Sequence, residues 1–213
     1  MNKKERTLRI LEFFNAQQSE ITTELNFCSV FQLLCAVVLS AQCTDKRVNT
    51  VTPQLFNRFP TPEAMADASP EEIRHIIASI SYPNTKAEKL AALARKIVTQ
   101  HNGVVPDTFE QLTALPGVGR KTANVMLAVA FGIPAMPVDT HVFRVSRRLG
   151  IATQSADTPE KVEQQLTKLI PSELLAKAHH WLLLHGRYIC KARTPHCEAC
   201  GITHLCCWYR KQK

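Results

Sequence analysis

The sequence lacks an apolar run long enough to span a membrane. Its longest apolar stretch, residues 27–41, covers 15 residues and is interrupted by Ser29, Gln32 and Ser40, whereas a spanning helix needs about 20. No apolar run follows the charged residues 3–6 near the start, so we expect neither a signal peptide nor an anchor. We therefore expect an intracellular, cytoplasmic protein with no membrane partner.

Sustained strand alternation, internal repeats and low-complexity segments are also missing. With 213 residues, 45% of them hydrophobic, the chain can bury a core as one domain or two small ones, which excludes disorder. Apolar residues instead recur with the period of a helix. The helical patterns cover about 5–18, 29–42, 46–58, 70–79, 84–101, 107–114, 120–131, 140–149, 159–169 and 174–185. The sequence therefore predicts an all-α fold.

Local signals mark the ends of these helices. Ser69-Pro70 and Thr158-Pro159 each place a capping hydroxyl before a first-turn proline. Helix breakers fall at Pro60/Pro62, Pro83, Gly103/Pro106, Pro116-Gly117, Pro134/Pro137, Gly150 and Pro171. Because two prolines and a glycine stop a helix and stiffen a linker, residues 132–137 are the best candidate for a crossing between two lobes.

The positive charge is concentrated in two segments. The chain carries 26 Lys and Arg against 18 Asp and Glu, a net charge of +8. Residues 117–148 hold five basic side chains against one acid, and residues 186–213 hold six against one. Such concentration favours a DNA or RNA partner over a membrane. A solvated basic face is the alternative.

The eight cysteines are also unevenly placed. Five of them fall within 18 residues, at Cys190, Cys197, Cys200, Cys206 and Cys207. A disulfide scaffold would need export and a small, loop-rich chain, so this group indicates a metal site. Four thiolates can bind an iron–sulfur cluster or tetrahedral zinc, although the spacing Cys-x₆-Cys-x₂-Cys-x₅-Cys fits the two close pairs of a zinc site poorly. Earlier in the chain, Cys28, Cys35 and Cys43 are expected in the core.

Residues 115–123, with the sequence LPGVGRKTA, are the most informative segment. Two glycines spaced by one residue allow a sharp turn between two helical patterns. The first amides of the following helix favour an anion such as a phosphate, and Arg120 and Lys121 add positive charge. The pattern predicts a helix-hairpin-helix that binds a DNA backbone without sequence preference. An ordinary turn between helices is the alternative.

Lys121 and Asp139 are the candidate catalytic residues. Positive potential at a helix start and from Arg120 disfavours the charged form of Lys121, which suits its amine to attack on a sugar carbon and to Schiff-base chemistry. A phosphate-binding lysine is the alternative role. Asp139 follows Pro137 and precedes a helical pattern, so it is expected as an N-cap. A carboxylate held in this way could also face a developing cation.

Five motifs together resemble the endonuclease III group of the helix-hairpin-helix DNA glycosylase superfamily. They are Leu39-Ser-Ala-Gln42, Leu115 to Lys121, Val138 to Arg144, His185-Gly-Arg-Tyr188 and the cysteine run. The resemblance covers nearly the whole chain. It implies an enzyme that flips oxidised or ring-saturated pyrimidines out of duplex DNA, cleaves the glycosidic bond and nicks the abasic strand by β-elimination.

The resemblance also implies roles for individual residues. Lys121 would attack the sugar C1′ and form the Schiff base, and Asp139 would stabilise the positive charge on the sugar. Gln42 would fill the gap that the flipped base leaves. Gly117, Val118, Gly119, Arg120 and His141 would contact DNA.

One loop departs from the family pattern. Family members commonly carry a glycine and then a bulky wedge residue where this chain has Ser81, Tyr82 and Pro83. Tyr82 could still stack against a base, but the loop's shape, and with it the lesion and opposite-base preference, is open. Adenine-mismatch glycosylases, the nearest competing branch, usually lack the hairpin lysine and place a glutamate where Val38 stands, so the bifunctional branch is favoured.

For the cysteine run, the resemblance implies a [4Fe-4S] cluster held by Cys190, Cys197, Cys200 and Cys206. It also implies two helical lobes: a six-helix lobe over 22–133 that contains the hairpin, and a lobe of 1–21 with 134–213 that contains the iron–sulfur loop. Lys121 and Asp139 would meet where the lobes adjoin. We expect a monomer, associated with the nucleoid if the source is bacterial, whose partner is duplex DNA with damaged pyrimidines or abasic sites.

Two hypotheses from other classes stay open at this point. One is a non-catalytic DNA-binding module that uses the hairpin only for binding. The other is an electron-transfer protein whose cluster is the active part. The histidines at 141, 179, 180 and 185, with Trp181 and Leu182, are expected to pack or hydrogen-bond within the fold rather than bind a metal.

Overall fold

The structure of the chain is a computed structural model that describes residues 1–17 and 23–212. Every regular element in those residues is a helix, so the predicted all-α fold is confirmed. The first helix, α1, spans Lys3–Gln17; residue 18, the end of the pattern predicted there, lies outside the described residues. The lobe boundary expected between residues 21 and 22 lies outside them as well.

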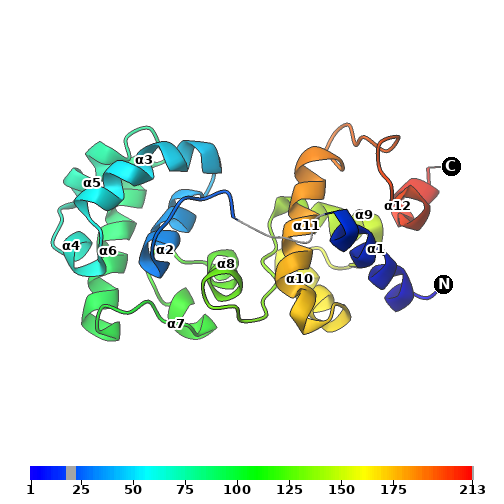
Figure 1. Cartoon of the computed structure of the whole chain (residues 1–213), viewed down its shortest axis with the longest axis horizontal. Helices are drawn as coiled ribbons and strands as arrows, with labels where there is room; N and C mark the ends of the chain where they lie inside the picture. The colour runs from blue at the N-terminus through cyan, green and yellow to red at the C-terminus, as the bar shows by residue number, and fades with distance from the viewer. Residues whose placement is uncertain (18–22, 213) are drawn as a thin grey trace. The chain divides into compact units, whose positions relative to one another are not determined.

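The chain forms two compact units (Figure 1). One unit is Thr23–Ile133, and the other combines Met1–Thr22 with Pro134–Lys213. The division therefore falls inside the 132–137 stretch, where Gly132 takes a left-handed φ of 65°. One unit is continuous in sequence, whereas the other is built from both ends of the chain.

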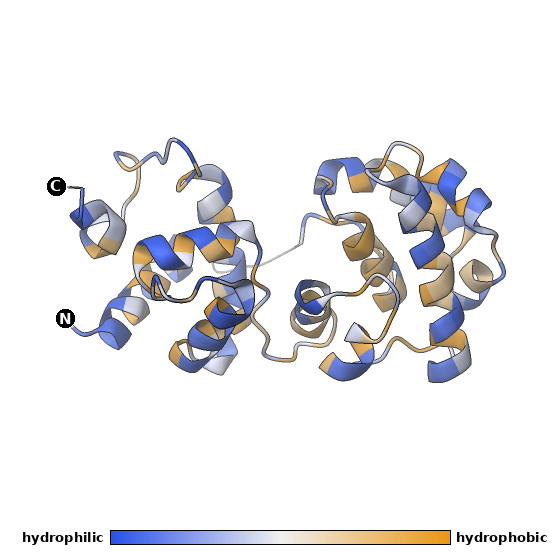
Figure 2. Cartoon of the chain, turned by 180° about the vertical axis from the view of Figure 1, so that it is seen from behind, coloured by the Kyte–Doolittle hydropathy of each residue, from blue (hydrophilic) through white to orange (hydrophobic). Residues whose placement is uncertain are grey.

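The Thr23–Ile133 unit surrounds one apolar helix, α2. Its helices are α2 (Val30–Leu39), α3 (Asp45–Arg58), α4 (Pro62–Ala66), α5 (Pro70–Ile76), α6 (Pro83–His101), α7 (Phe109–Thr113) and α8 (Arg120–Ala130). Figure 2 shows α2 apolar along most of its length, beside helices with polar outer faces. Eight of its ten residues are buried, as a helix that is hydrophobic on all sides requires.

Two of the expected helix breakers in this unit start helices instead. Pro62 begins the short helix α4 after the N-cap Thr61, and Pro83 begins α6. Proline suits the first turn of a helix because its missing N–H would have no intrahelical partner there. The unit therefore has seven helices between residues 23 and 133, all described, where six were expected. Ser69 caps α5 as predicted, and it also forms a capping box with Glu72.

The other unit joins α1 to the C-terminal helices. These are α9 (Thr140–Leu149), α10 (Pro159–Leu169), the 3₁₀ helix η1 (Ser172–Leu174), α11 (Leu175–Tyr188), the 3₁₀ helix η2 (Thr203–Leu205) and α12 (Cys207–Arg210). Ile10, Leu11 and Phe14 of α1 belong to the same buried cluster as Trp181 and Leu182 of α11. Trp181 and Leu182 were expected in the core, and the buried cluster confirms both.

Expectations for the isolated cysteines and histidines had mixed outcomes. Cys35 is fully buried, as expected, but Cys28 is exposed and Cys43 half-buried. Cys28 precedes the N-cap of α2, so it lies outside the apolar part of that helix. His179 is buried and its Nδ1 lies 2.8 Å from the Pro137 carbonyl, in agreement with a packed, hydrogen-bonded role.

None of the helices within the described residues is both long enough and apolar enough to cross a membrane.

Candidate functional site

The predicted hairpin is present between α7 and α8. Leu115 and Val118 are buried, and the Val118 N–H donates to the Leu115 carbonyl at 3.1 Å. Gly117 between them takes φ 81°, a left-handed conformation that favours glycine. The two apolar anchors and the glycine together fold residues 114–119 into a tight turn.

The start of α8 has no side-chain cap. Its N-cap is Gly119, which has no side chain to accept from the first amides, whereas Thr108 caps the preceding helix, α7. No described atom lies within 4 Å of where a Cβ would stand on Gly119. The first N–H groups of a helix attract an anion, so α8 presents an open anion site. Arg120 and Lys121, both exposed, are the first two residues of this helix.

Two contacts that the sequence did not predict support the hairpin. The Arg120 guanidinium lies over the Phe109 ring, 4.8 Å from its centre. The stem of Lys89, on α6, packs against Gly117 so closely that a Cβ there would lie 3.2 Å from it. Lys89 is exposed, so a further positive charge is anchored beside the turn. Lys89 lies 28 residues before Gly117, and no local pattern connects them.

Asp139 is the N-cap of α9, as predicted. Its Oδ1 accepts from the Val142 N–H at 2.7 Å. The preceding backbone is tied to α11, because His179 Nδ1 lies 2.8 Å from the Pro137 carbonyl. The carboxylate is therefore fixed at the start of α9 by one of its two oxygens.

Gln42 and Tyr82 lie on loops that contact each other. Gln42 follows α2 and Tyr82 precedes α6; both are exposed, and their φ values are 53° and 57°. Left-handed backbone is strained for residues such as these and clusters at functional sites. Ser81 Oγ donates to the Gln42 carbonyl at 2.9 Å. Where the family pattern has a glycine and a bulky residue, this chain thus presents an exposed aromatic ring and a hydroxyl that is bonded to the other loop.

His141 is half-buried and contacts neighbouring residues. A Cβ on Gly186 would lie 2.8 Å from the His141 Cβ, so the glycine lets α11 approach α9. His141 Nδ1 lies 3.3 Å from Arg144 Nη2. These contacts agree with the expected packed histidine.

Four of the five C-terminal cysteines line one cavity. Cys190, Cys197, Cys200 and Cys206 share it with apolar neighbours that include Leu149, Ile189 and Trp208. Burial raises the pKa of the Cys200 thiol, and the thiols of Cys206, Cys190 and Cys197 raise it further, while the backbone N–H of Ile202 acts in the opposite direction. The four cysteines thus line a single cavity, and the other three thiols lie close enough to Cys200 to act on its charge. Cys207 is not part of this lining.

The donor set fits a cluster better than a single ion. Four thiolates around one zinc would lie about 3.8 Å from each other, because each is about 2.3 Å from the metal. No group of three or more His, Cys, Asp or Glu side chains in the part of the chain described is spaced to hold one metal ion. The four thiols in one cavity and its apolar walls fit an iron–sulfur cluster, which four cysteines commonly hold.

Two further side chains contact the cysteine sulfurs. Arg148 Nη1 donates to Cys190 Sγ at 3.4 Å and to the Lys191 carbonyl at 2.7 Å. His185 Nε2 lies 3.8 Å from Cys200 Sγ, and burial lowers the pKa of His185 to about 4. Hydrogen bonds to ligand sulfurs tune an iron–sulfur cluster, and neither residue was predicted to make them.

Internal partners account for much of the basic excess in 117–148. Arg144 donates to the Gly186 and Cys190 carbonyls, Arg147 to the Gln154 carbonyl, and Arg148 to those of Lys191 and Ala192. These three guanidinium groups hold α9 to its neighbours. The net charge of residues 117–148 therefore overstates how many of their basic side chains act only in DNA binding.

Family models match both parts of the chain. A model described as "HhH-GPD superfamily base excision DNA repair protein" matches residues 35–172. A second, described as "Iron-sulfur binding domain of endonuclease III", matches residues 190–206. The second match ends at Cys206 and excludes Cys207.

Relatives and solved structures cover nearly the entire chain. Endonuclease III of Escherichia coli (strain K12) is 48% identical over 206 residues, 97% of this chain and 96% of its own length. Endonuclease III of Rickettsia conorii is 47% identical over 201 residues, with 94% and 95% covered. A trapped endonuclease III–DNA covalent intermediate matches with a TM-score of 0.92 and 42% identity, covering 100% of this chain and 99% of that one.

Matches in both the helical core and the cysteine segment define a class, the helix-hairpin-helix proteins of base-excision DNA repair that carry an iron–sulfur loop. Within that class, the chain belongs to the endonuclease III family. It is accordingly a DNA N-glycosylase with abasic-site lyase activity, its cofactor is a [4Fe-4S] cluster, and its partner is DNA. The DNA-binding module without catalysis and the electron-transfer protein are thereby set aside.

Proposed function

We propose that the chain excises oxidised or ring-saturated pyrimidines from duplex DNA and then cleaves the abasic strand through a Schiff base on Lys121. The observation that carries the proposal is the place of Lys121, exposed in the first turn of a helix that has no side-chain cap and follows the hairpin. A lysine there lies beside amides that favour a DNA phosphate.

The proposed chemistry has two stages. The Lys121 amine attacks the sugar C1′ while the bond from C1′ to the damaged base breaks and the base leaves with a proton. The sugar ring then opens, giving an iminium between Lys121 Nζ and C1′. Loss of a proton from C2′ expels the 3′ phosphate by β-elimination, and water finally hydrolyses the imine to free the lysine.

In this proposal, Asp139 stabilises the positive charge that develops on the sugar as the base departs. A carboxylate fixed before reaction does so without reorganisation. The N-cap bond from Val142 to Oδ1 supports the role, because it restrains the side chain and leaves Oδ2 for the substrate.

The remaining site residues would bind DNA or the cofactor. The backbone amides of Gly117 and Gly119 and the Arg120 side chain would bind a phosphate at the turn that Val118 anchors. Gln42 would fill the gap left by the flipped base, and Tyr82 would stack beside it. His141, in the first turn of α9, would also contact DNA. Cys190, Cys197, Cys200 and Cys206 would hold the cluster, which in turn fixes the fold of residues 190–206.

We further propose that the enzyme acts as a monomer on DNA inside the cell, at the nucleoid in a bacterial source. A single chain carries both proposed catalytic residues and all four proposed cluster ligands, which supports action without a second copy.

Borohydride trapping on a panel of duplexes tests the proposal. Each duplex carries one oxidised pyrimidine, one ring-saturated pyrimidine, one oxidised purine, one mismatched adenine or one abasic site. We expect covalent adducts with both pyrimidine lesions and with the abasic site, and at least about 1,000-fold fewer with Lys121→Gln, since covalent catalysis through the amine is lost. Lys168→Gln, which removes an exposed lysine of α10 outside the hairpin, is the control and should keep trapping. Undiminished trapping by Lys121→Gln, or adducts confined to the purine lesions, would contradict the proposal.

A further inference from the structure

The loops that carry Gln42 and Tyr82 are joined to each other before any DNA arrives. Ser81, immediately before Tyr82, donates its hydroxyl to the carbonyl of Gln42 itself at 2.9 Å. The two residues are 39 positions apart in the sequence. The bond therefore links the Gln42 carbonyl to the side chain of the residue before Tyr82, and the proposed function assigns both Gln42 and Tyr82 to the base gap.

Lys86 provides a second connection between the same loops. Its backbone N–H donates to the Tyr82 carbonyl at 3.1 Å. Its ammonium, on a side chain that is almost fully buried, donates to the carbonyls of Leu39 at 2.9 Å and Ala41 at 2.7 Å. One residue thus holds the start of α6 and the end of α2 together.

Both loops need such support because both are strained. Among the described residues other than glycine, positive φ occurs at Gln42, Tyr82 and Asn102, and only asparagine adopts this conformation readily. Tyr82 also precedes Pro83, which disfavours helical backbone at the residue before it. Strain of this kind persists only where surrounding bonds determine the conformation.

The side chains on these loops extend away from the fold. Tyr82 is 64% exposed although it is aromatic, and Gln42 is exposed as well. A bond that fixes two exposed side chains relative to each other adds little to the core, but it reduces the ordering cost when both enter one DNA gap.

We propose that Ser81 is a positioning residue that couples the two loops, so that Gln42 and Tyr82 enter damaged DNA as one preformed unit. The inference depends on the proposed function, because it assumes that both side chains contact DNA. A hydroxyl at position 81 would thereby make the effects of the two side chains on binding interdependent.

A double-mutant cycle measured in two backgrounds tests the coupling. The affinity for a duplex with a stable abasic-site analogue is measured at fixed salt for Gln42→Ala, Tyr82→Ala and the double variant, first with Ser81 and then with Ser81→Ala. With Ser81 we expect the double variant to lose less affinity than the product of the single losses. With Ser81→Ala the losses should multiply, because separated loops act independently.

Ser81→Ala alone should weaken binding to the abasic duplex about fivefold, the factor that one hydrogen bond of ordinary net strength provides. Ser81→Thr keeps the donor and should restore affinity to within about twofold. Affinity for undamaged duplex should stay unchanged in all three proteins, since there is no gap to fill. A merely structural role for Ser81 would instead reduce both affinities together.

The outcomes separate the coupling from the proposed function. If Gln42→Ala and Tyr82→Ala each bind like the unmodified protein, the assigned DNA contacts are wrong and the coupling falls with them. If each weakens binding but the cycle is the same in both backgrounds, the contacts stand and the coupling is overturned.

Discussion

Two adjacent cysteines have different surroundings at the scale of single residues. Cys206 lines the cavity that it shares with three other cysteines. The sulfur of Cys207 instead lies beside Gly150, at the C-terminal end of α9, and accepts from Arg210 Nη2 at 3.7 Å. Spacing in the sequence favoured Cys206 as the fourth ligand, and the lining of the cavity supports the same choice.

Gly150→Ala should destabilise the protein because of this packing. Gly150 takes φ 76°, and a Cβ on it would lie 2.5 Å from Cys207 Sγ and 3.0 Å from Arg6 Nη2. We expect the loss to be about 2 to 3 kcal/mol, from backbone strain and overpacking together. The midpoint of thermal unfolding should fall by about 5 to 10 °C.

Gly132→Ala is the matched control for this prediction. Its φ of 65° is also left-handed, but nothing in the described part of the chain lies within 4 Å of the added carbon. Only the backbone cost of about 1 kcal/mol remains, so the midpoint should fall by about 2 to 4 °C. Equal shifts in the two variants would show that the side chains of Cys207 and Arg6 move aside without a cost in stability.

At the scale of elements, the end of α2 depends on a side chain from another helix. The last carbonyls of a helix have no intrahelical partners. Here the Lys86 ammonium, from the first turn of α6, binds the carbonyl of Leu39 and that of Ala41 just beyond it. A positive charge at this end also suits the helix dipole.

Lys86→Met should therefore cost about 2 kcal/mol, because it leaves two carbonyls without their partner in a largely buried place. We expect a fall of about 4 to 8 °C in the thermal midpoint. Lys89→Met, on the same helix but exposed, should change it by less than about 2 °C. A stability for Lys86→Met equal to that of the control would mean that the two carbonyls find other partners.

Long helices could be predicted from the sequence more fully than the contacts between them. Periodicity located α6 and α11, and capping signals located the start of α5 at Ser69. The five-residue helix α4 was missed because it is too short to show a period and because Pro62 indicated a breaker. The bond from Ser81 to Gln42 joins residues far apart in the chain, so no local pattern could predict it.

The same distinction applies to the site. The hairpin, the N-cap at Asp139 and the cysteine run are each local in sequence, and all three were predicted. Arg148 and His185, which contact cysteine sulfurs, are 42 and 15 residues from the cysteines that they approach. Their contacts with the sulfurs depend on how α9 and α11 pack, and no local sequence pattern predicts that packing.

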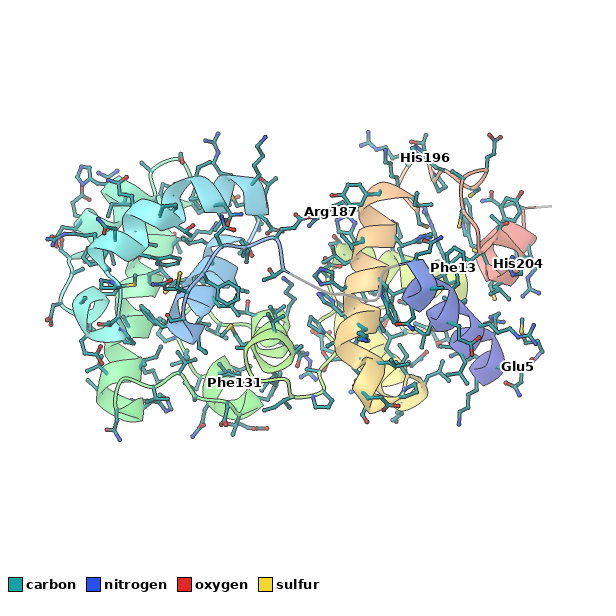
Figure 3. The ribbon with its side chains drawn as sticks, in the orientation of Figure 1. Glu5, Phe13, Phe131, Arg187, His196 and His204 are labelled. Atoms are coloured by element: carbon teal, nitrogen blue, oxygen red, sulfur yellow. The ribbon has the colours of Figure 1, made fainter. Side chains whose placement is uncertain are left out.

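At the scale of the whole molecule, the two units should respond differently to loss of the cofactor. Residues 190–206 contain one short 3₁₀ helix and depend for their shape on the cysteines. Phe13 of α1, labelled in Figure 3, packs against Gly201 in this segment, where an added Cβ would lie 2.7 Å from its ring. Folding of this segment and binding of the cluster are thus coupled.

Removal of iron by a chelator should therefore loosen one unit selectively. We expect amide hydrogen exchange in residues 190–212 to rise by at least about tenfold, corresponding to ~1.4 kcal/mol of local opening. Exchange in α2 to α8 should stay the same, because the Thr23–Ile133 unit holds none of the four cysteines. An equal rise in both units would contradict this independence, and readdition of iron and sulfide should reverse the change.

The discontinuous unit has a consequence for synthesis. The apolar face of α1 packs against residues that begin at position 134, so the helix is made more than a hundred residues before its partners. At roughly 5 to 20 residues per second, α1 waits about 6 s or longer on the ribosome with Ile10, Leu11 and Phe14 uncovered. The continuous unit can complete its core during that interval. A helix translated before the continuous unit is therefore among the last to fold.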